Sequence, residues 1–382
     1  MQRIKIILPL NLLMKTNRFL LCKRLISKYG PNDSYLKHVK RDEKNRQFVE
    51  AFPEVINTLT EYCASQNLPH LTQHLEEMVD FTVLKLKRFR HTVVLEAYKP
   101  LETPEGFSED KYRLVIMLAW CFELTLAAMV VQDDLWDQTE IRANDISWYK
   151  KPDVGLNAIT DGKLLYGAAL VLLRKYFASL KQYGELKELF NEMRIALAKG
   201  QAMDWSYKSN GKLAYETFNM DTYRVTARYK AGMPIFAFPF AGALSMTGNM
   251  SLWYGTKDVI ADLGLHFQVD NDILDIYDKH GRLRPCVGSD IREGKRTWVA
   301  VKILESDNER IIEAFKANYG RPERDCEGHV VRILDEFNIY EKYLDHHTKS
   351  KKMVENLTRN MMPSLRKAVL STVENVFPPV GE

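Results

Sequence analysis

Residues 114–137 read LVIMLAWCFELTLAAMVVQDDLWD, and this stretch decides the fold class. It is apolar on nearly every side up to Val131, apart from Glu123 and Thr125, and it then runs directly into an acidic end. The length would suit a membrane span. An internal glutamate and an acidic end instead favour the central helix of a bundle, surrounded by other helices. We therefore expect a buried helix here and no transmembrane segment.

The helical pattern continues through the rest of the chain, whereas alternation of period two is almost absent. Residues 233–246 are apolar as well, but Pro234 and Pro239 should kink or interrupt a helix there. No linker or internal repeat divides the sequence, so we expect one all-α domain over residues 33–382, with about ten helices of ordinary length. Apolar residues recur at helical spacing over 259–276, 298–304 and 353–376.

Composition narrows the class of protein. With 46% hydrophobic and 27% charged residues among 382, the chain can bury a large core, which excludes general disorder. Its five cysteines are odd in number, widely spaced and free of any Cys-x-x-Cys pair. Neither a disulfide framework nor a zinc site is expected, and a reducing compartment fits best.

Residues 1–32 form a basic leader with seven lysines and arginines and no acidic residue. Such a leader predicts a transit peptide and a mitochondrial location. The alternative is a basic helical extension that stays on a cytoplasmic protein. The remaining 350 residues hold 47 basic and 50 acidic side chains, so the charge gives no support to nucleic-acid binding.

An acidic cluster, Asp133-Asp134-Leu-Trp-Asp137, closes the apolar stretch. On a helix Asp133 and Asp137 lie one turn apart and share a face, where they repel each other unless a cation sits between them. Hard divalent cations such as Mg²⁺ prefer this oxygen ligation. Taken alone, such a cluster would more often be interpreted as a solvated acidic helix end.

A second cluster, Asp270-Asn271-Asp272-Ile-Leu-Asp275, closes another apolar helical run about 135 residues later. Asn271 and Asp275 again share a face of the helix. Two such helix ends are expected to face each other across a cavity, with Mg²⁺ ions and a phosphate-rich substrate between them.

At these residues the chain resembles the trans-isoprenyl diphosphate synthases, the family that contains farnesyl diphosphate synthase. The resemblance covers residues 85–300 closely. It implies the all-α class I terpenoid synthase fold, a helical bundle around a central cavity, with three Mg²⁺ ions that grip a prenyl diphosphate substrate, and a homodimer. Besides the two clusters it includes Arg142, Gly-Gln-Ala-Met-Asp at 200–204, Arg-Tyr-Lys at 228–230 and Lys-Arg-Thr-Trp at 295–298.

The resemblance also implies roles for individual residues. The predicted metal ligands are Asp133, Asp134, Asp137, Asp204, Asn271, Asp272 and Asp275, of which Asp133, Asp137, Asn271 and Asp275 are expected to be catalytic. The predicted substrate-binding residues are Arg142, Lys230, Lys295, Gln201, Lys87, Arg90, Ala128 and Met129.

The chain departs from the family pattern where isopentenyl diphosphate should bind. Lys87 and Arg90 keep their spacing, but the two glycines before them are lost, and Ala143 replaces one of two adjacent arginines. An arginine fork is the preferred grip on phosphate oxygens, and alanine offers no substitute. We therefore expect a class I terpene synthase, a lyase that ionises one prenyl diphosphate and yields a cyclic or acyclic terpene.

Pocket depth bears on the substrate of such an enzyme. By resemblance, bulky aromatic residues four and five positions before the first aspartate stop the prenyl chain in farnesyl diphosphate synthases. Here those positions hold Met129 and Ala128, which predicts a deeper pocket. Farnesyl diphosphate (C15) is the expected substrate, followed by geranylgeranyl diphosphate (C20).

Two alternatives stay open from the sequence. The first is a divergent prenyl diphosphate synthase that performs farnesyl-type chain elongation or irregular coupling. The second is a catalytically inactive partner subunit. Formation of a longer diphosphate from dimethylallyl and isopentenyl diphosphates would single out the first alternative.

Overall fold

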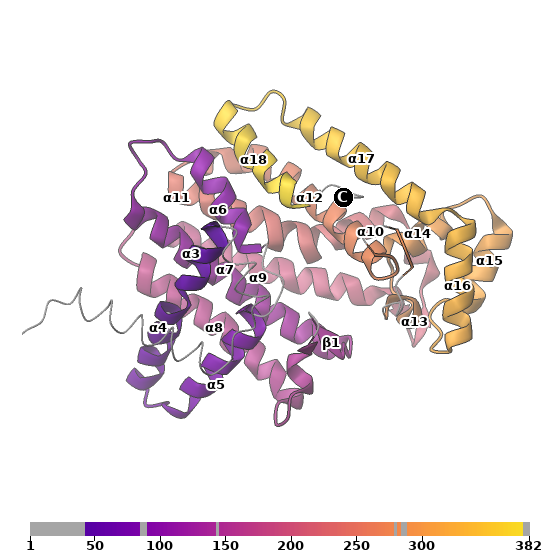
Figure 1. The fold of residues 1–382 in the computed structure, drawn as a ribbon, viewed down its shortest axis with the longest axis horizontal. Helices are drawn as coiled ribbons and strands as arrows, with labels where there is room; N and C mark the ends of the chain where they lie inside the picture. Colours follow the sequence, from indigo (N-terminus) through magenta and orange to yellow (C-terminus); the bar gives the residue numbers. More distant parts are fainter. Residues whose placement is uncertain (1–42, 85–89, 143–144, 279–280, 284–288, 377–382) are drawn as a thin grey trace, which may run out of the picture.

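The computed structural model describes residues 43–84, 90–142, 145–278, 281–283 and 289–376. Helices make up most of this part of the chain, and the strands within it pair into two short antiparallel hairpins. Figure 1 shows α3 to α5 at one end of the bundle and α15 and α16 at the other, while α17 and α18 lie along one side. The all-α prediction is confirmed, and the basic leader lies outside the described residues.

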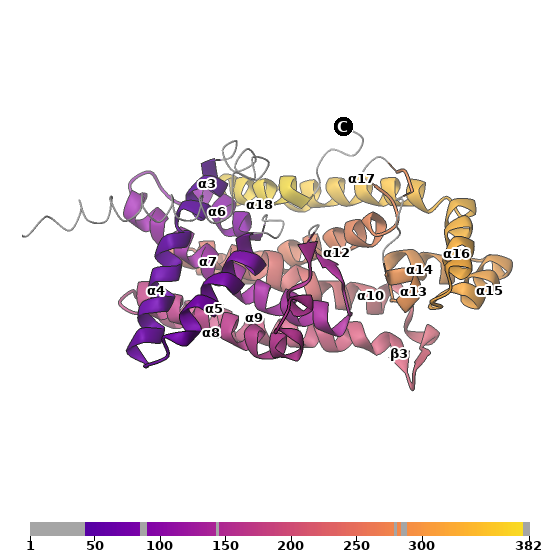
Figure 2. The same ribbon diagram turned by 60° about the horizontal axis from the view of Figure 1, so that its bottom comes forward.

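The elements are numbered in chain order, and Figures 1 and 2 label those for which the views have room. The first half holds α3 (Glu43–Glu50), α4 (Phe52–Ser65), α5 (His70–Val79), η1 (Asp80–Leu84), α6 (Arg90–Leu101), α7 (Glu109–Trp136), β1 (Ile141–Arg142), β2 (Asp145–Ile146), η2 (Trp148–Lys150), η3 (Gly155–Asn157), α8 (Ala158–Phe177), α9 (Tyr183–Asp204), η4 (Trp205–Tyr207), β3 (Lys208–Ser209) and β4 (Lys212–Leu213). The second half holds η5 (Tyr215–Thr217), α10 (Met220–Ala227), η6 (Arg228–Ala237), α11 (Phe238–Thr247), η7 (Met250–Leu252), α12 (Trp253–Leu274), α13 (Asp290–Glu293), α14 (Trp298–Leu304), α15 (Glu309–Asn318), α16 (Arg324–Glu336), α17 (Ile339–Leu357) and α18 (Pro363–Val376).

Helix α7 is the core of the bundle, as its all-round apolar pattern predicts. Ser108 caps its first turn by accepting a hydrogen bond from the Lys111 amide. Trp120 is fully buried, stacks on Phe48 with 4.4 Å between ring centroids, and donates its indole N–H to the Phe48 carbonyl. Within the described residues, α7 and the segment Gly155–Phe177 are long and apolar enough to cross a membrane. The most apolar part of α7 is 83% buried by other parts of the protein. Helix α7 is therefore a core helix of the bundle and not a membrane span.

A π-helical segment, η6, interrupts the helix path between α10 and α11. Pro234 lies inside η6, and Pro239 lies in the first turn of α11, where proline is tolerated. Because a prolyl nitrogen cannot donate the regular helical hydrogen bond, a widened turn accommodates it here. The interruption expected at the two prolines is therefore present as a π-helix, and it carries Lys230.

Two close helix contacts bring the walls of the bundle together around η6. A Cβ atom added to Gly200 of α9 would lie 2.6 Å from the Lys230 amide nitrogen. A Cβ atom on Gly232 would lie 2.1 Å from the Ala261 carbonyl oxygen of α12, and Gly264 faces Gly232 in the same way. Only glycine fits at these crossings, so backbone contact fixes α9, η6 and α12 to one another.

Candidate active site

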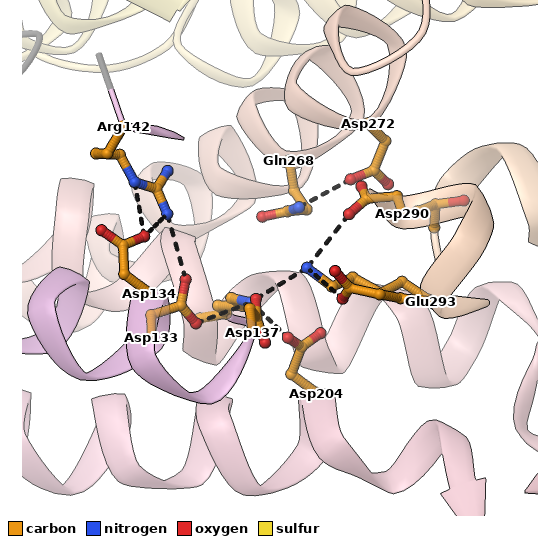
Figure 3. Close-up of polar contacts among 12 residues, drawn as sticks. Asp133, Asp134, Asp137, Arg142, Asp204, Gln268, Asp272, Asp290 and Glu293 are labelled. Carbon is orange, nitrogen blue, oxygen red and sulfur yellow. Dashed lines mark hydrogen bonds and ion pairs between the residues drawn. The ribbon is translucent and has the colours of Figure 1, made fainter. Parts of the chain in front are cut away.

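The two acidic clusters lie at helix ends that face each other. Asp133, Asp134 and Asp137 lie at the end of α7, while Asp272 lies near the end of α12 and faces them from the other side (Figure 3). Asp204, the last residue of α9, approaches from a third direction. The arrangement expected from the sequence, with two acidic helix ends that face each other, is therefore present.

Lys230 projects from η6 between two of these walls. Its ammonium group donates a hydrogen bond to Asp204 and lies 3.5 Å from Asp133 Oδ1. Burial alone would lower the pKa of Lys230, but the carboxylates of Asp133 and Asp204 outweigh it and raise the pKa above its usual value. Lys230 therefore stays charged and joins α7 to α9.

Lys295 closes the opposite side from the turn between α13 and α14. Its Nζ atom lies 2.8 Å from Asp137 Oδ2, 3.2 Å from Asp290 Oδ1 and 3.5 Å from Glu293 Oε2. Burial would again lower the pKa of this lysine, but the carboxylates around it raise the pKa well above normal. One half-buried cation thus links the first acidic cluster to α13.

The pKa values of Asp133 and Asp137 are shifted in opposite directions. Burial would raise the pKa of Asp133, but Lys230, Lys295 and Arg142 together hold it below its ordinary value. Burial and the neighbouring charge of Asp133 raise the pKa of Asp137, even though Lys295 opposes the shift. Asp133 is therefore the more firmly ionised of the two.

The guanidinium group of Arg142 is hydrogen bonded to the carboxylate of Asp134. Asp134 is 2% exposed, and the guanidinium donates to Asp134 Oδ1 through Nε at 2.8 Å and also through Nη2. The same Nη2 atom lies 3.9 Å from Asp133 Oδ2. Arg142 thus orders the end of α7 while its charge faces the site.

The second cluster divides into buried and exposed members. Asp272 is 3% exposed and accepts hydrogen bonds from Tyr223 Oη at 2.7 Å, the Trp298 amide at 2.7 Å and Gln268 Nε2 at 2.8 Å. Burial, followed by the charge of Asp290, raises the pKa of Asp272 to about 7. These bonds tie the end of α12 to α10 and α14.

Asn271 and Asp275 are the members of the second cluster with open ligand capacity. Asn271 is exposed. The Oδ2 atom of Asp275 is buried and has no hydrogen-bond partner in the described part of the chain. Burial and the charge of Asp290 raise the pKa of Asp275 to about 7. A buried carboxylate oxygen without a donor is the kind of atom that a cation would satisfy.

Gln201 joins the helix α9 wall to the first cluster. With its amide oriented to suit both neighbours, it donates to Asp133 Oδ1 at 3.1 Å and accepts from Trp205 Nε1 at 3.2 Å. Met129 and Gln201 also line a cavity of about 960 Å³ between α7 and α9. Ala128, the other predicted pocket residue, is buried in the core.

The donor set fits Mg²⁺ only together with a phosphate ligand. Among the described residues, no group of three or more His, Cys, Asp or Glu side chains converges closely enough to hold an ion. Lysine ammonium groups stand between the carboxylates instead. Mg²⁺ in nucleotide and diphosphate sites typically uses one or two carboxylates plus phosphate oxygens, and these walls provide that pattern.

Asp290 and Glu293 belong to the site but were not predicted from the sequence. The two acids precede Lys295 by five and two positions, and the turn after α13 folds them onto its ammonium group. A lysine close in sequence to two acids is a weak signal, because many exposed turns share it. Lys87 and the side chain of Arg90 lie outside the described residues.

Comparison with known proteins gives one consistent family. The farnesyl pyrophosphate synthase 2 of Arabidopsis thaliana is 31% identical over 304 residues, which cover 79% of this chain and 88% of that protein. The mitochondrial farnesyl pyrophosphate synthase 1 of the same plant is 30% identical and covers 79% of this chain and 78% of its own length. The fold matches a T. brucei farnesyl diphosphate synthase complexed with a bisphosphonate, with a TM-score of 0.80 and 23% identity, over 87% of this chain and 98% of that one.

These relatives overturn one expectation from the sequence. The predicted terpene synthase, a lyase, is wrong, because the relatives are synthases that elongate prenyl chains by transfer. The error came from treating two lost glycines and one lost arginine as loss of the second substrate. Those positions are few, whereas the similarity to the synthases extends over about four fifths of the chain.

The description "Polyprenyl synthetase" belongs to a family model that matches residues 72–337, more than two thirds of the sequence. The matched region includes both acidic clusters, Lys230 and Lys295. This protein therefore belongs to the polyprenyl synthetase family, the trans-isoprenyl diphosphate synthases.

Proposed function

We propose that this protein is a prenyl diphosphate synthase that couples an allylic prenyl diphosphate to isopentenyl diphosphate. The observation that carries this proposal is the position of Lys230 and Lys295 between carboxylates of three walls. Alternating ammonium and carboxylate groups offer a diphosphate direct cationic contacts, and they offer its metal counter-ions oxygen ligands. The names of the relatives support farnesyl diphosphate as the class of product.

Mg²⁺ is the cofactor that this donor set suits, and prenyl synthetases generally depend on it. Asp133, Asp137 and Asp204 would hold it on one side, and Asn271 and Asp275 on the other. When bound with the substrate, Mg²⁺ neutralises charge on the diphosphate leaving group. The unsatisfied Oδ2 atom of Asp275 supports this assignment, and the resemblance implies three ions.

In the proposed reaction the allylic carbon–oxygen bond breaks and its electron pair leaves with the diphosphate. Lys230, Lys295 and Arg142 stabilise the negative charge that grows on this leaving group. The double bond of isopentenyl diphosphate then supplies the electrons of the new carbon–carbon bond. Loss of a proton from the coupled cation restores a double bond. The protein thus acts mainly through electrostatic stabilisation and orientation of two substrates.

Lys87 and Arg90 are the proposed grip on isopentenyl diphosphate. They keep the family's spacing, and we expect the neighbouring loss of glycine and arginine to weaken this grip without removing it. Lys87→Ala should then raise the KM for isopentenyl diphosphate and leave the KM for the allylic substrate nearly unchanged. An equal rise in both constants would contradict the assignment.

The deciding experiment supplies purified protein with Mg²⁺, dimethylallyl diphosphate and isopentenyl diphosphate, followed by mass spectrometry of the products. We expect geranyl and farnesyl diphosphates, and no product when isopentenyl diphosphate is omitted. Omission of Mg²⁺ should also stop the reaction. Absence of any longer diphosphate from a folded protein would refute the proposal.

A homodimer and a mitochondrial location accompany the proposal. Exposed apolar side chains on α8 and α9, namely Ile159, Leu170 and Ile195, offer a surface that a second copy would cover. Light scattering of the purified chain tests the dimer. The mitochondrial relative and the basic leader support import, which a fusion of residues 1–32 to a fluorescent reporter would test.

A further inference from the structure

Arg296, the residue next to Lys295, is buried although it carries a charge. It is 5% exposed, and among the described residues no carboxylate forms an ion pair with it. Its Nε atom is also buried without a hydrogen-bond partner in the described part of the chain. A desolvated cation without a paired acid is costly to a fold, so its position calls for a specific compensation.

Four neutral oxygens provide that compensation. Nη2 donates to the Met203 carbonyl at 2.7 Å and to Thr226 Oγ1 at 3.0 Å. Nη1 donates to Thr217 Oγ1 at 3.1 Å and to Ser206 Oγ at 3.2 Å. The acceptors belong to α9, α10, η5 and η4, so one planar group joins four separate elements.

The end of α9 also stabilises the charge. Met203 is the penultimate residue of this helix, and its carbonyl is one of those without a partner inside the helix. The negative end of the helix dipole therefore faces the guanidinium. Burial lowers the pKa of Arg296, while the nearby charge of Asp204 raises it.

The hydrogen bonds of Arg296 join two segments that each carry a residue of the candidate active site. Asp204 follows Met203 directly and accepts a hydrogen bond from Lys230. On the other side, Lys295 precedes Arg296, and Tyr319 Oη donates to the Lys295 carbonyl at 2.6 Å. The backbone of Lys295 is thus fixed by Tyr319 from one direction and by the Arg296 side chain from another.

We propose that Arg296 is a positioning residue that holds the turn carrying Lys295 at a fixed distance from the helix end carrying Asp204, so that both face one Mg²⁺–diphosphate group. This inference rests on the proposed function. Arg296 itself does not touch the substrate. It sets the separation between one cationic contact and one carboxylate contact, and outer residues of this kind typically change affinity by about 10–100-fold when they are replaced.

The test measures binding of inorganic pyrophosphate with Mg²⁺ by calorimetry, alongside circular dichroism and turnover. Arg296→Met should bind about tenfold more weakly or worse while it keeps its helical spectrum. Arg292→Met is the matched control, because Arg292 lies in the same segment but pairs with Glu327 on α16. It should bind as the unaltered protein does.

Thr226→Val provides a second, milder variant in case Arg296→Met does not fold. It removes one acceptor of the guanidinium with a side chain of similar shape. It should weaken pyrophosphate binding in the unaltered protein but have no further effect in the Arg296→Met background. Normal binding by either folded single variant, or equal losses from Thr226→Val in both backgrounds, would overturn the inference. Failure of the unaltered protein to elongate prenyl chains would instead refute the proposed function.

Discussion

Replacement of Lys295 by methionine tests the charge arrangement of the whole site. The substitution keeps most of the apolar stem and removes the ammonium group from among Asp137, Asp290 and Glu293. These carboxylates would then face one another without a cation. We expect the folded protein to lose stability in the absence of metal and to recover part of it when Mg²⁺ is added.

The size of the loss follows from the contacts. At about 3 Å and an effective dielectric constant of about 20, each Lys295–carboxylate contact contributes a gross attraction of roughly 5 kcal/mol. Desolvation of the ammonium offsets much of this, and removal of one partner from a buried pair typically costs about 3–5 kcal/mol. We expect a loss near the lower limit, about 3 kcal/mol, which for a chain of this size lowers the Tm by about 4 °C.

Added Mg²⁺ should act differently on the two proteins. At ten times its Kd, a bound ion raises the free energy of unfolding by about 1.4 kcal/mol, which would restore roughly half of the loss in Lys295→Met. The unaltered protein should gain almost nothing, because Lys295 already neutralises these carboxylates and Mg²⁺ fits the intact site only together with a phosphate ligand. Thermal unfolding with and without Mg²⁺, in the absence of diphosphate, measures both effects.

Two controls separate charge from general disturbance. Lys295→Arg keeps the positive charge and should lose less stability than Lys295→Met. Lys302→Met removes a lysine from α14 whose nearest acid, Glu305, is 4.0 Å away, and it should cost less than about 1 kcal/mol. If Lys295→Met were as stable as the unaltered protein, or if Mg²⁺ stabilised both equally, the electrostatic account of the site would be refuted.

Three other predictions concern the metal ligands, the pocket and the response to acid. Asp133→Ala or Asp275→Ala should abolish Mg²⁺-dependent turnover while the circular dichroism spectrum stays unchanged, because each removes an oxygen ligand rather than a core side chain; full activity in either variant would contradict the assignment. Met129→Phe should shift the product toward C10, as measured by mass spectrometry, because Met129 lines the cavity between α7 and α9 and a bulky ring there would shorten it; an unchanged share of C15 would argue against this wall. Burial lowers the pKa of His266 to about 3 and that of His346 to about 4, and the two rings contact each other between α12 and α17 with 3.2 Å between His266 Nδ1 and His346 Nε2. Below about pH 6.5 the unfolded chain therefore binds protons at these histidines and the folded chain does not. The stability that comes from burying the two neutral rings is present above about pH 6.5 and is lost as the pH falls toward 4. His346→Gln should reduce the slope of the unfolding free energy between pH 5 and 6 by about 1.4 kcal/mol per pH unit, as measured by urea unfolding; an unchanged slope would exclude this pair as a source of acid sensitivity.

The all-α fold could be predicted from the sequence, because buried helices show a recognisable pattern of apolar residues. Helix α7 is apolar all round because helices surround it, and its 28 residues contain the stretch that predicted it. The two hairpins could not be foreseen, since each strand has two residues and no alternation. The π-helix η6 could be foreseen only as an interruption near Pro234, because its widened turn depends on contacts with α9 and α12.

The site was accessible only in part. Spacing on a helix identified Asp133 and Asp137, and resemblance identified Lys230, Lys295 and Gln201, which the structure brings together. Spacing alone could not separate aspartates that point into the cavity from those that other side chains engage. Asp134 and Asp272 were predicted as ligands on equal terms with their neighbours, yet each is buried and hydrogen bonded within the protein.

The burial of Arg296 could not be predicted from the sequence. An arginine after a lysine in a charged turn has the pattern of a solvent-exposed residue. Its burial depends on the meeting of α9, α10, η4 and η5 around it, and its acceptors in these elements lie 70 to 93 residues before it in the chain. Only the three-dimensional arrangement assigns it a position.

The glycine contacts at η6 restrict how this enzyme can close around a substrate. Gly200 contacts the Lys230 backbone and Gly232 contacts Gly264, so α9, η6 and α12 must move together as one rigid block. That block carries Asp204, Lys230 and the second acidic cluster, so none of these can approach another by sliding. We expect any tightening on the ligand to come from α7 moving toward a stationary wall that includes the Lys295 turn, and distances between spin labels on α7 and α12 should shorten when pyrophosphate and Mg²⁺ bind, while those between α9 and α12 stay constant.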